Sequence, residues 1–213
     1  MSKNTKERIL CAARALFNEH GYTQVGMRAI AKETNISLGN LTYHYPLKDD
    51  IVWALYLEFS SQTENQLKLN EEEAIASAVL NALLDYYKAV FEYRFFALEL
   101  PYFIKHYEAI RVQYQEMARL KKKQLLDLLF RLRSQGLMFH ETVDGYDQLL
   151  TEQWFLHSNF WLAQQTLAKP DLDPSTIEKG VEDLFHLLLP QMTLIGKKRF
   201  REALKELGST LLL

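Results

Sequence analysis

The stretch "NISLGNLTYHYP", residues 35–46, decides how the chain begins to fold. Ser37 is a strong N-cap for a short helix over residues 38–45. Asn35 tolerates the left-handed backbone conformation that a tight turn often requires. Another short helix, over residues 27–34, ends directly before this turn. Two short helices joined by three or four residues form the helix-turn-helix pattern.

The two faces of the second of these helices differ in chemistry. At helical spacing, Leu38, Leu41 and Tyr45 share one face, which we expect to pack against the preceding helices. The residues on or beside the opposite face are Asn40, Thr42, Tyr43 and His44. Asparagine can pair with adenine, and tyrosine or histidine can reach phosphate oxygens or a thymine methyl group. The pattern therefore favours DNA binding over the simpler interpretation, a small bundle with a solvated polar face.

Charge supports the same interpretation. Residues 1–48 contain seven Lys or Arg and three Glu, a net charge of +4, so the formal charge of −2 on the whole chain leaves −6 for the remainder. A basic head on an acidic body indicates that the head meets an anion, although chance variation in surface charge is the alternative. Gly39 lowers helix stability by about 1 kcal/mol relative to alanine, which is easier to explain if a partner approaches the backbone closely.

Helical periodicity extends over nearly all of the 213 residues. Apolar residues recur at spacings of three and four, and 8 Gly and 5 Pro give few interruptions. The sequence predicts an all-α fold with a three-helix helix-turn-helix head, residues 1–48, and a larger helical body, residues 49–213. The expected helices cover residues 5–20, 27–34, 38–45, 49–69, 71–94, 98–106, 107–136, 144–167, 175–189 and 197–207, with the "NEEE" of residues 70–73 as a cap and Pro101 as a break.

Composition narrows the class of protein. Charges interrupt the apolar runs well short of a membrane span, and the first residues, "MSKNTKERIL", lack the apolar stretch of a secretion signal. A single cysteine, Cys11, excludes an intramolecular disulfide. We therefore expect a cytoplasmic protein with no cofactor, no metal site and no catalytic residues. A di-iron enzyme would need two Glu-x-x-His pairs, and only Asp183 to His186 approximates one.

The segment from Thr5 to Ile51 resembles the DNA-binding domain of the TetR family of bacterial transcriptional repressors. The matching motifs are "A…LF…GY" near residues 12–22, "R-x-I-A" at residues 28–31, and "S-x-G-x-L…H-[FY]…K-[DE]" at residues 37–49. The resemblance implies base or phosphate contacts from Ser37, Leu38, Asn40, Tyr43 and His44, and backbone-positioning contacts from Arg28 and Lys48. Thr42 stands where the family usually has tyrosine, so the family's operator sequences do not carry over directly.

For residues 49–213 the resemblance is architectural, and it implies a helical body for ligand binding and dimerisation. Aromatic residues are concentrated there. They predict either an aromatic-lined cavity for a small, apolar or aromatic effector or the filling of a core and a dimer face. We expect the cavity between the helices of residues 71–94 and 144–167. The candidate effector-binding residues are Tyr86, Phe91, Phe103, His106, Tyr107, Trp154 and His157.

Two further surfaces of the body are expected. Segments 148–167 and 181–189 are apolar over wide faces, which predicts a four-helix interface with a second copy of the chain. Such a homodimer would place two recognition helices about one DNA turn apart on a near-palindromic, double-stranded operator. The basic run "RLKKKQ", residues 119–124, lies far from the head and is expected to be a solvated face.

The residues and the resemblance together imply a ligand-responsive transcriptional regulator, a repressor in the first instance, that a small-molecule effector releases from its operator. Activation is the alternative, because the sign of regulation depends on where the operator lies. A helical module that binds protein instead of DNA is the rival from another class. Loss of binding at high salt and competition by bulk DNA would separate the two.

Overall fold

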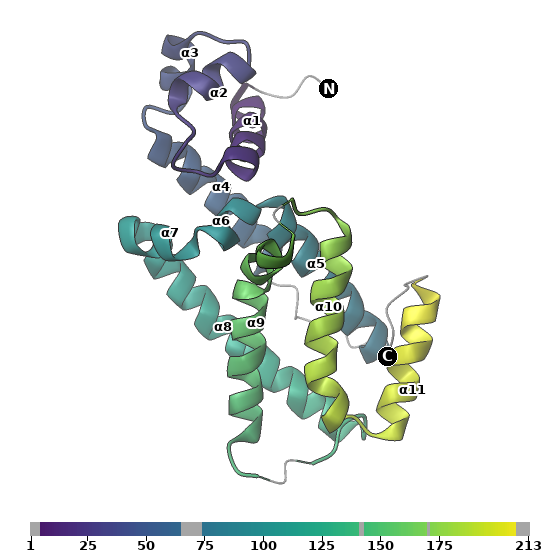
Figure 1. Cartoon of the computed structure of the whole chain (residues 1–213). Helices are drawn as coiled ribbons and strands as arrows, with labels where there is room; N and C mark the ends of the chain where they lie inside the picture. The colour runs from purple at the N-terminus through teal and green to yellow at the C-terminus, as the bar shows by residue number, and fades with distance from the viewer. Residues whose placement is uncertain (1–4, 65–73, 141–142, 170, 208–213) are drawn as a thin grey trace.

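The structure, a computed structural model, describes residues 5–64, 74–140, 143–169 and 171–207. It confirms the all-α prediction (Figure 1). Met138 and Met192 form an isolated bridge. The helices in order are α1 (Thr5–His20), α2 (Met27–Glu33), α3 (Leu38–His44), α4 (Lys48–Thr63), α5 (Ile75–Glu92), α6 (Arg94–Leu98), α7 (Leu100–His106), α8 (Glu108–Ser134), α9 (Tyr146–Ala168), α10 (Ser175–Leu188), the 3₁₀ turn η1 (Leu189–Gln191) and α11 (Leu194–Glu206). Within the described part of the chain, no helix has both the length and the hydropathy needed to cross a membrane.

Most of the predicted helices are present, and several boundaries differ; α11, for example, begins at Leu194 and not at residue 197. α4 ends at Thr63, earlier than predicted, and the predicted "NEEE" cap lies outside the described residues. The following helix ends at Glu92, and Tyr93 separates it from the short α6. Pro101 does not break a helix but occupies the first turn of α7. A backbone N–H in that turn has no intrahelical partner, so proline, which lacks this N–H, removes no helical hydrogen bond there.

Helices α1, α2 and α3 form the head at one end of the molecule (Figure 1). Its core contains Ile9 and Phe17 of α1, Ile30 of α2 and Leu41 of α3, all fully buried. Gly21 follows α1 with a φ of 79°, a conformation that glycine adopts without steric penalty. The chain can therefore turn sharply from α1 toward α2.

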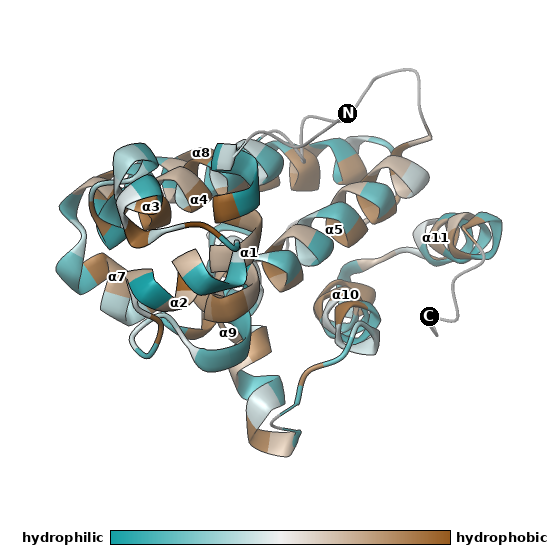
Figure 2. Cartoon of the chain, turned by 90° about the horizontal axis from the view of Figure 1, so that it is seen from above, coloured by the Kyte–Doolittle hydropathy of each residue, from teal (hydrophilic) through white to brown (hydrophobic). Residues whose placement is uncertain are grey.

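The remaining helices form the body, which α4 enters from the head (Figure 1). α5 contacts α4, α10 and α11, while α9 contacts α6, α8 and α10. Viewed from above, α10 and α11 are seen almost end-on beside α5 (Figure 2). The body core includes Tyr87 of α5, Trp161 of α9 and Phe185 of α10. Burial of a large apolar side chain contributes roughly 1.5–3 kcal/mol, so this core holds α5, α9 and α10 together.

The head and the body are joined by a shared apolar cluster. Phe17 of α1 lies 5.2 Å from Phe95 of α6, and Tyr22 lies 5.1 Å from Phe103 of α7, measured between ring centroids. Leu55 of α4 belongs to the same cluster. Because these side chains come from both sides of residue 48, the head is packed on the body and is not attached only through the backbone.

Candidate DNA-binding and effector sites

The turn before α3 has the geometry that its residues predict. Asn35 has a φ of 54°, in the left-handed region. The Ser37 hydroxyl accepts a hydrogen bond from the Asn40 backbone N–H at 3.1 Å, which confirms the predicted N-cap. On the inner face, Leu41 and Tyr45 are buried in the head core, as predicted. The helix is therefore fixed from within, and its outer face is left free.

The outer face of α3 presents the polar residues on which the DNA prediction depends. Tyr43 is 83% exposed, and Asn40 is exposed beside it. His44 is half-buried, with its ring 5.3 Å from that of Tyr43. The Thr42 hydroxyl instead donates to two backbone carbonyls of its own helix at 3.1 Å. Asn40 and Tyr43 are thus the side chains of α3 with the greatest freedom to meet a partner.

Leu38 departs from the prediction based on helical spacing. Its side chain is 38% exposed and does not join the head core. Leu38 is the first residue of α3, and helix side chains tilt toward the N-terminus, so it extends beyond the turn that packs inward. This exposure agrees with the DNA contact that the resemblance implies for it. Ser37 and Arg28 are also exposed, so all three residues are accessible to a partner.

Lys48 is placed differently from the exposed residues of α3. Its ammonium donates a hydrogen bond to the Tyr22 carbonyl at 2.5 Å and lies 3.6 Å from the centroid of the Tyr22 ring. Burial lowers the pKa of Lys48, while Glu99 and Asp49 partly offset that effect. In this state the residue fastens the start of α4 to the loop after α1. A phosphate contact from Lys48 would have to replace these interactions.

Tyr107 lies at this same junction between head and body. Its hydroxyl donates to the Asp49 carboxylate at 2.9 Å and is in hydrogen-bond contact with the Tyr22 hydroxyl. Burial, followed by these two hydrogen bonds, raises the pKa of Tyr107. The Tyr22 backbone N–H donates to Glu99 at 2.7 Å. Tyr107, predicted as an effector contact, is therefore part of the polar network that holds the head.

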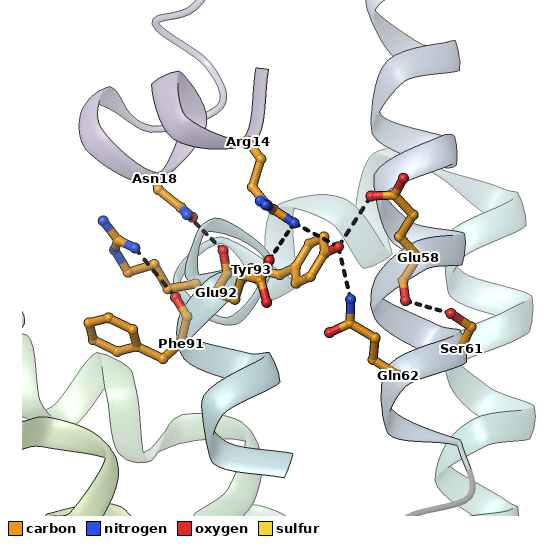
Figure 3. A network of polar contacts seen from close by, with 9 residues as sticks. Arg14, Asn18, Glu58, Ser61, Gln62, Phe91, Glu92 and Tyr93 are labelled. Carbon is orange, nitrogen blue, oxygen red and sulfur yellow. Dashed lines mark hydrogen bonds and ion pairs between the residues drawn. The ribbon is translucent and has the colours of Figure 1, made fainter. Parts of the chain in front are cut away.

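A second polar network connects α1 with the segment between α5 and α6 (Figure 3). Arg14 forms an ion pair with Glu92 at 2.6 Å and donates to the Tyr93 hydroxyl at 2.9 Å. That hydroxyl donates to Glu58 of α4 at 3.2 Å. The Asn18 amide donates to the Glu92 carbonyl at 2.8 Å. These partners are far apart in the sequence, and no local motif marks them, so sequence reasoning missed this network.

Two small cavities lie in the body where the effector cavity was predicted. The first has a volume of about 40 Å³, and its lining residues are Thr63, Ala82, Leu83, Tyr86, Lys121, Lys122, Gln124, Leu125, Trp154, Phe155 and Ser158. The second has a volume of about 30 Å³, and its lining residues are Tyr56, Phe59, Tyr86, Val90, Phe96, Ala97, Leu100, Phe103, Ile110, Tyr114, Met117, Ser158 and Asn159. Such volumes hold a few water molecules, so a larger ligand requires side chains to move.

The candidate effector residues are not all in one place. Tyr86 lines both cavities, Trp154 lines the first and Phe103 lines the second. Phe91 lines a surface groove beside α1. The remaining three residues lie outside both cavity linings: Tyr107 in the junction, His106 against the Tyr102 ring at 4.5 Å, and His157 with its Nδ1 2.9 Å from the Tyr87 hydroxyl.

The structure also places residues in the cavities that sequence reasoning did not select. Lys121 and Lys122 line the first cavity, although the segment 119–124 was expected to be a solvated face. This part of the α8 surface faces α5 and α9, so Lys121 and Lys122 of the basic run are partly buried. Tyr56 lines the second cavity, and its buried hydroxyl has no hydrogen-bond partner among the described residues. The burial of a lysine on a helix face cannot be predicted from the sequence, because it depends on how the neighbouring helices pack.

An apolar stripe lies on the outer surface of α9. Its members are spaced by seven, four and seven residues along the helix and are between 43% and 87% exposed: Leu149, Leu156, Phe160 and Leu167. The segment 181–189 contributes less than predicted. Val181, Leu184 and Phe185 are buried in the protomer's own core, while Leu187 is 39% exposed. A wide apolar surface on this segment was the wrong expectation, because α5, α9 and α11 already cover it.

Comparison with known proteins agrees with the observed fold and head geometry. The TetR model described as "Bacterial transcriptional repressor" matches residues 58–200, and the model described as "Bacterial regulatory proteins, tetR family" matches residues 9–55. The HTH-type transcriptional regulator UidR of Escherichia coli K12 is 41% identical over 54 residues, which cover 25% of this chain and 28% of UidR. The match thus spans less than a third of that relative's length.

Solved structures with a similar fold extend over almost the whole chain. A TetR-family transcriptional regulator from Marinobacter aquaeolei VT8 is 21% identical, with a TM-score of 0.84 over 95% of this chain and 98% of that chain. The SmeT–triclosan complex is 17% identical, with a TM-score of 0.60 over 90% of this chain and 93% of that one. These likenesses concern the fold, and the family models cover both head and body. The chain belongs to the TetR family of bacterial transcriptional regulators.

Proposed function

We propose that this protein is a ligand-responsive repressor that binds a near-palindromic DNA operator as a homodimer and is released by a small effector. Family membership establishes a transcriptional regulator and supports this finer assignment. The observation that carries the proposal is the outer face of α3, where Asn40 and Tyr43 are exposed on a helix anchored by the buried Leu41. A helix held in this way can enter a major groove without rearrangement.

DNA contacts are proposed for three groups of residues. Asn40 and Tyr43 read base edges or phosphates from the middle of α3, and His44 contacts the backbone from its end. Leu38 and Ser37 approach the groove at the start of α3. Arg28, Thr42 and Lys48 complete the surface, with Lys48 exchanging its intramolecular contacts for a phosphate. Because several of these contacts are to phosphates, operator affinity should fall steeply as salt concentration rises.

The homodimer is proposed to form through the apolar stripe of α9. Leu149, Leu156, Phe160 and Leu167 share one face of a 23-residue helix, which is the spacing that helix bundles use at interfaces. In a two-fold arrangement each stripe would meet its own copy. The two heads would then be held in one molecule at a fixed separation, which suits an operator with two half-sites.

The effector is proposed to bind in the cavities of the body. The fold neighbour SmeT was solved as a complex with triclosan, a precedent for a small molecule in this fold. In this chain the second cavity is walled by Tyr56 of α4, Phe96 of α6 and Phe103 of α7. The same three helices contact the head, so a ligand that pushes these side chains apart also shifts the support of the head. DNA is released to the extent that the ligand prefers the shifted state.

The test is selection of binding sites from a random pool of DNA duplexes by the purified full-length protein. Tyr43→Ala is selected in parallel, with Phe130→Ala as the control, since Phe130 is a 73% exposed aromatic residue on α8, away from the head. We expect the wild type and Phe130→Ala to recover the same near-palindrome and Tyr43→Ala to recover none. Equal recovery of unrelated sequences by all three proteins would refute sequence-specific reading by α3 and favour a protein-binding module.

A further inference from the structure

Lys121 of α8 stands out among the basic side chains near the body cavities. It lines the first cavity with Tyr86, Trp154 and Phe155. Its ammonium nitrogen lies 4.3 Å from the centroid of the Tyr86 ring. The side chain therefore places a positive charge against an aromatic ring at the wall of a small, partly open cavity.

The neighbouring cations are paired with carboxylates, whereas Lys121 has no ion pair within the part of the chain that the structure describes. Lys122 forms an ion pair with Glu152 at 2.7 Å, and Arg119 forms one with Glu116 at 2.6 Å. For Lys121, no carboxylate lies within ion-pair distance among the described residues, and no acidic side chain is among those lining the cavity. The contact with the Tyr86 ring is its favourable interaction, and burial lowers its pKa to about 7.

An uncompensated charge in an apolar site is unfavourable, and protein interiors normally pair such a group. Lys121 is half-buried, so its hydration is reduced, and no carboxylate of residues 5–64, 74–140, 143–169 or 171–207 pairs with it in return. A bound anion would compensate for the lost hydration, and its attraction to the ammonium would be stronger in these low-dielectric surroundings than in water. A ligand of opposite charge would therefore be stabilised beside the Lys121 ammonium.

The second cavity shows what the rest of such a ligand meets. It shares Tyr86 and Ser158 with the first cavity and is otherwise lined mainly by apolar and aromatic side chains. Of its polar groups, the Tyr114 hydroxyl donates to the Asn159 side-chain oxygen at 2.9 Å, whereas the Tyr56 hydroxyl is buried without a partner among the described residues. Because Tyr86 forms part of both linings, its displacement would join the two spaces into one. The joined space would have a cation at one end and an aromatic lining at the other.

We propose that the effector is an amphipathic organic anion, whose single carboxylate or sulfonate is bound by Lys121 while its apolar, aromatic-sized body displaces Tyr86 and fills the second cavity. This inference rests on the proposed effector-binding role of the body and specifies the chemical class of ligand. Lys122, already paired with Glu152, contributes the aliphatic part of its side chain to the wall. Tyr56 offers a hydrogen bond to a polar atom on the ligand body.

The test uses two fluorescent probes that differ only in charge. Anilinonaphthalene sulfonate carries an anionic group on an aromatic body, and N-phenylnaphthylamine is the same body without the sulfonate. Each is titrated into the full-length wild type, Lys121→Met, Lys121→Arg and Lys123→Met. Lys123 is the matched control, because it lies two positions along α8, is exposed and does not line the cavity. Circular dichroism confirms that each variant is folded.

We expect Lys121→Met to weaken anilinonaphthalene sulfonate binding by roughly tenfold to a hundredfold, the effect of losing one charge-assisted contact. Lys121→Arg should restore most of it, Lys123→Met should resemble the wild type, and N-phenylnaphthylamine should bind all four proteins alike. If Lys121→Met and Lys123→Met change sulfonate binding equally, the charge is not read by Lys121 and the inference fails, although a neutral effector site remains. If neither probe binds, the cavities are not a ligand site, and the proposed effector role fails with it.

Discussion

Replacing Lys121 by methionine should stabilise the ligand-free protein. Burial lowers the pKa of this lysine from 10.5 to about 7. At 1.36 kcal/mol per pH unit the difference corresponds to about 5 kcal/mol of destabilisation. That figure is an upper value, because the side chain is half-buried and water screens the charge. Allowing also for the lost contact with Tyr86, we expect the free energy of unfolding to rise by about 1–2 kcal/mol.

The size of this gain should depend on pH in a defined direction. In the unfolded chain Lys121 releases its proton near pH 10.5, and in the folded protein it does so near pH 7. Between these values the unfolded state holds more protons, so the stability of the wild type rises with pH. The penalty of burying the charge is complete below about pH 7 and disappears toward about pH 10.5. The benefit of methionine should therefore be largest in mild acid and smaller in mild base.

Urea unfolding of the two proteins at about pH 6 and about pH 9 measures both the gain and its pH dependence. At the lower pH the midpoint of thermal unfolding should also rise, by about 2–8 °C for a chain of this size. Lys123→Met, on the exposed side of α8, should change neither quantity. A Lys121→Met protein that is less stable than the wild type at about pH 6, or equally stabilised at both pH values, would refute the reasoning.

Three further predictions concern packing, DNA contact and assembly. In Gly180→Ala the new Cβ would lie 2.4 Å from the Tyr87 ring, so we expect the free energy of unfolding in urea to fall by about 1–3 kcal/mol. An unchanged unfolding midpoint would show that α10 can move away from Tyr87. In Gly39→Ala the new Cβ meets no close neighbour, so head stability should rise by up to about 1 kcal/mol. Operator binding, measured by fluorescence anisotropy, should weaken. Undiminished affinity would exclude a close approach of DNA to the backbone at this position. Phe160→Glu places a charge in the α9 stripe and should shift sedimentation toward the monomer, whereas an unchanged dimer would mean that another surface forms the interface.

The head could be predicted from the sequence because its determinants are local. Ser37 caps the helix that follows it, and Asn35 adopts the positive φ of the turn. Both effects act within a few residues, so the order of residue types is sufficient. Helical spacing also identified Leu41 and Tyr45 as inner residues. It failed at Leu38, because a helix of only seven residues leaves its first side chain beyond the packed turn.

The body sites could not be predicted to the same depth, because their determinants are relations between helices. The aromatic content indicated a cavity, and the structure has two: Tyr86 lines both, Trp154 the first and Phe103 the second. Tyr107 is also aromatic but lies at the junction, and His106 lies against the Tyr102 ring. Phe103 and His106 lie on the same helix, α7, and only Phe103 lines a cavity. The packing of α7 against its neighbours determines this difference, which no spacing along the chain contains.

The case of Lys121 illustrates the same limit for charge. A run of basic residues on a helix normally faces water, and the neighbouring Lys123 does so. One helical position shifts the side chain by about 100°, and the packing of α5 and α9 on α8 determines which positions are enclosed. The chemical consequence, an ammonium beside the Tyr86 ring in a cavity without an acidic side chain among its described lining residues, becomes visible only when three separate helices are brought together.

In the proposed mechanism the route from effector to DNA is short, because Phe103 belongs both to the wall of the second cavity and to the support of the head. Phe103 lines the cavity and also lies 5.1 Å from the Tyr22 ring. The Tyr22 carbonyl in turn accepts a hydrogen bond from the Lys48 ammonium, and the Tyr22 hydroxyl is in hydrogen-bond contact with that of Tyr107. A ligand that displaces Phe103 therefore acts on the contacts that hold the head, with no long chain of intermediates. Coupling of this kind typically amounts to about 1–3 kcal/mol, so a change in head position worth one or two hydrogen bonds is sufficient to switch operator binding.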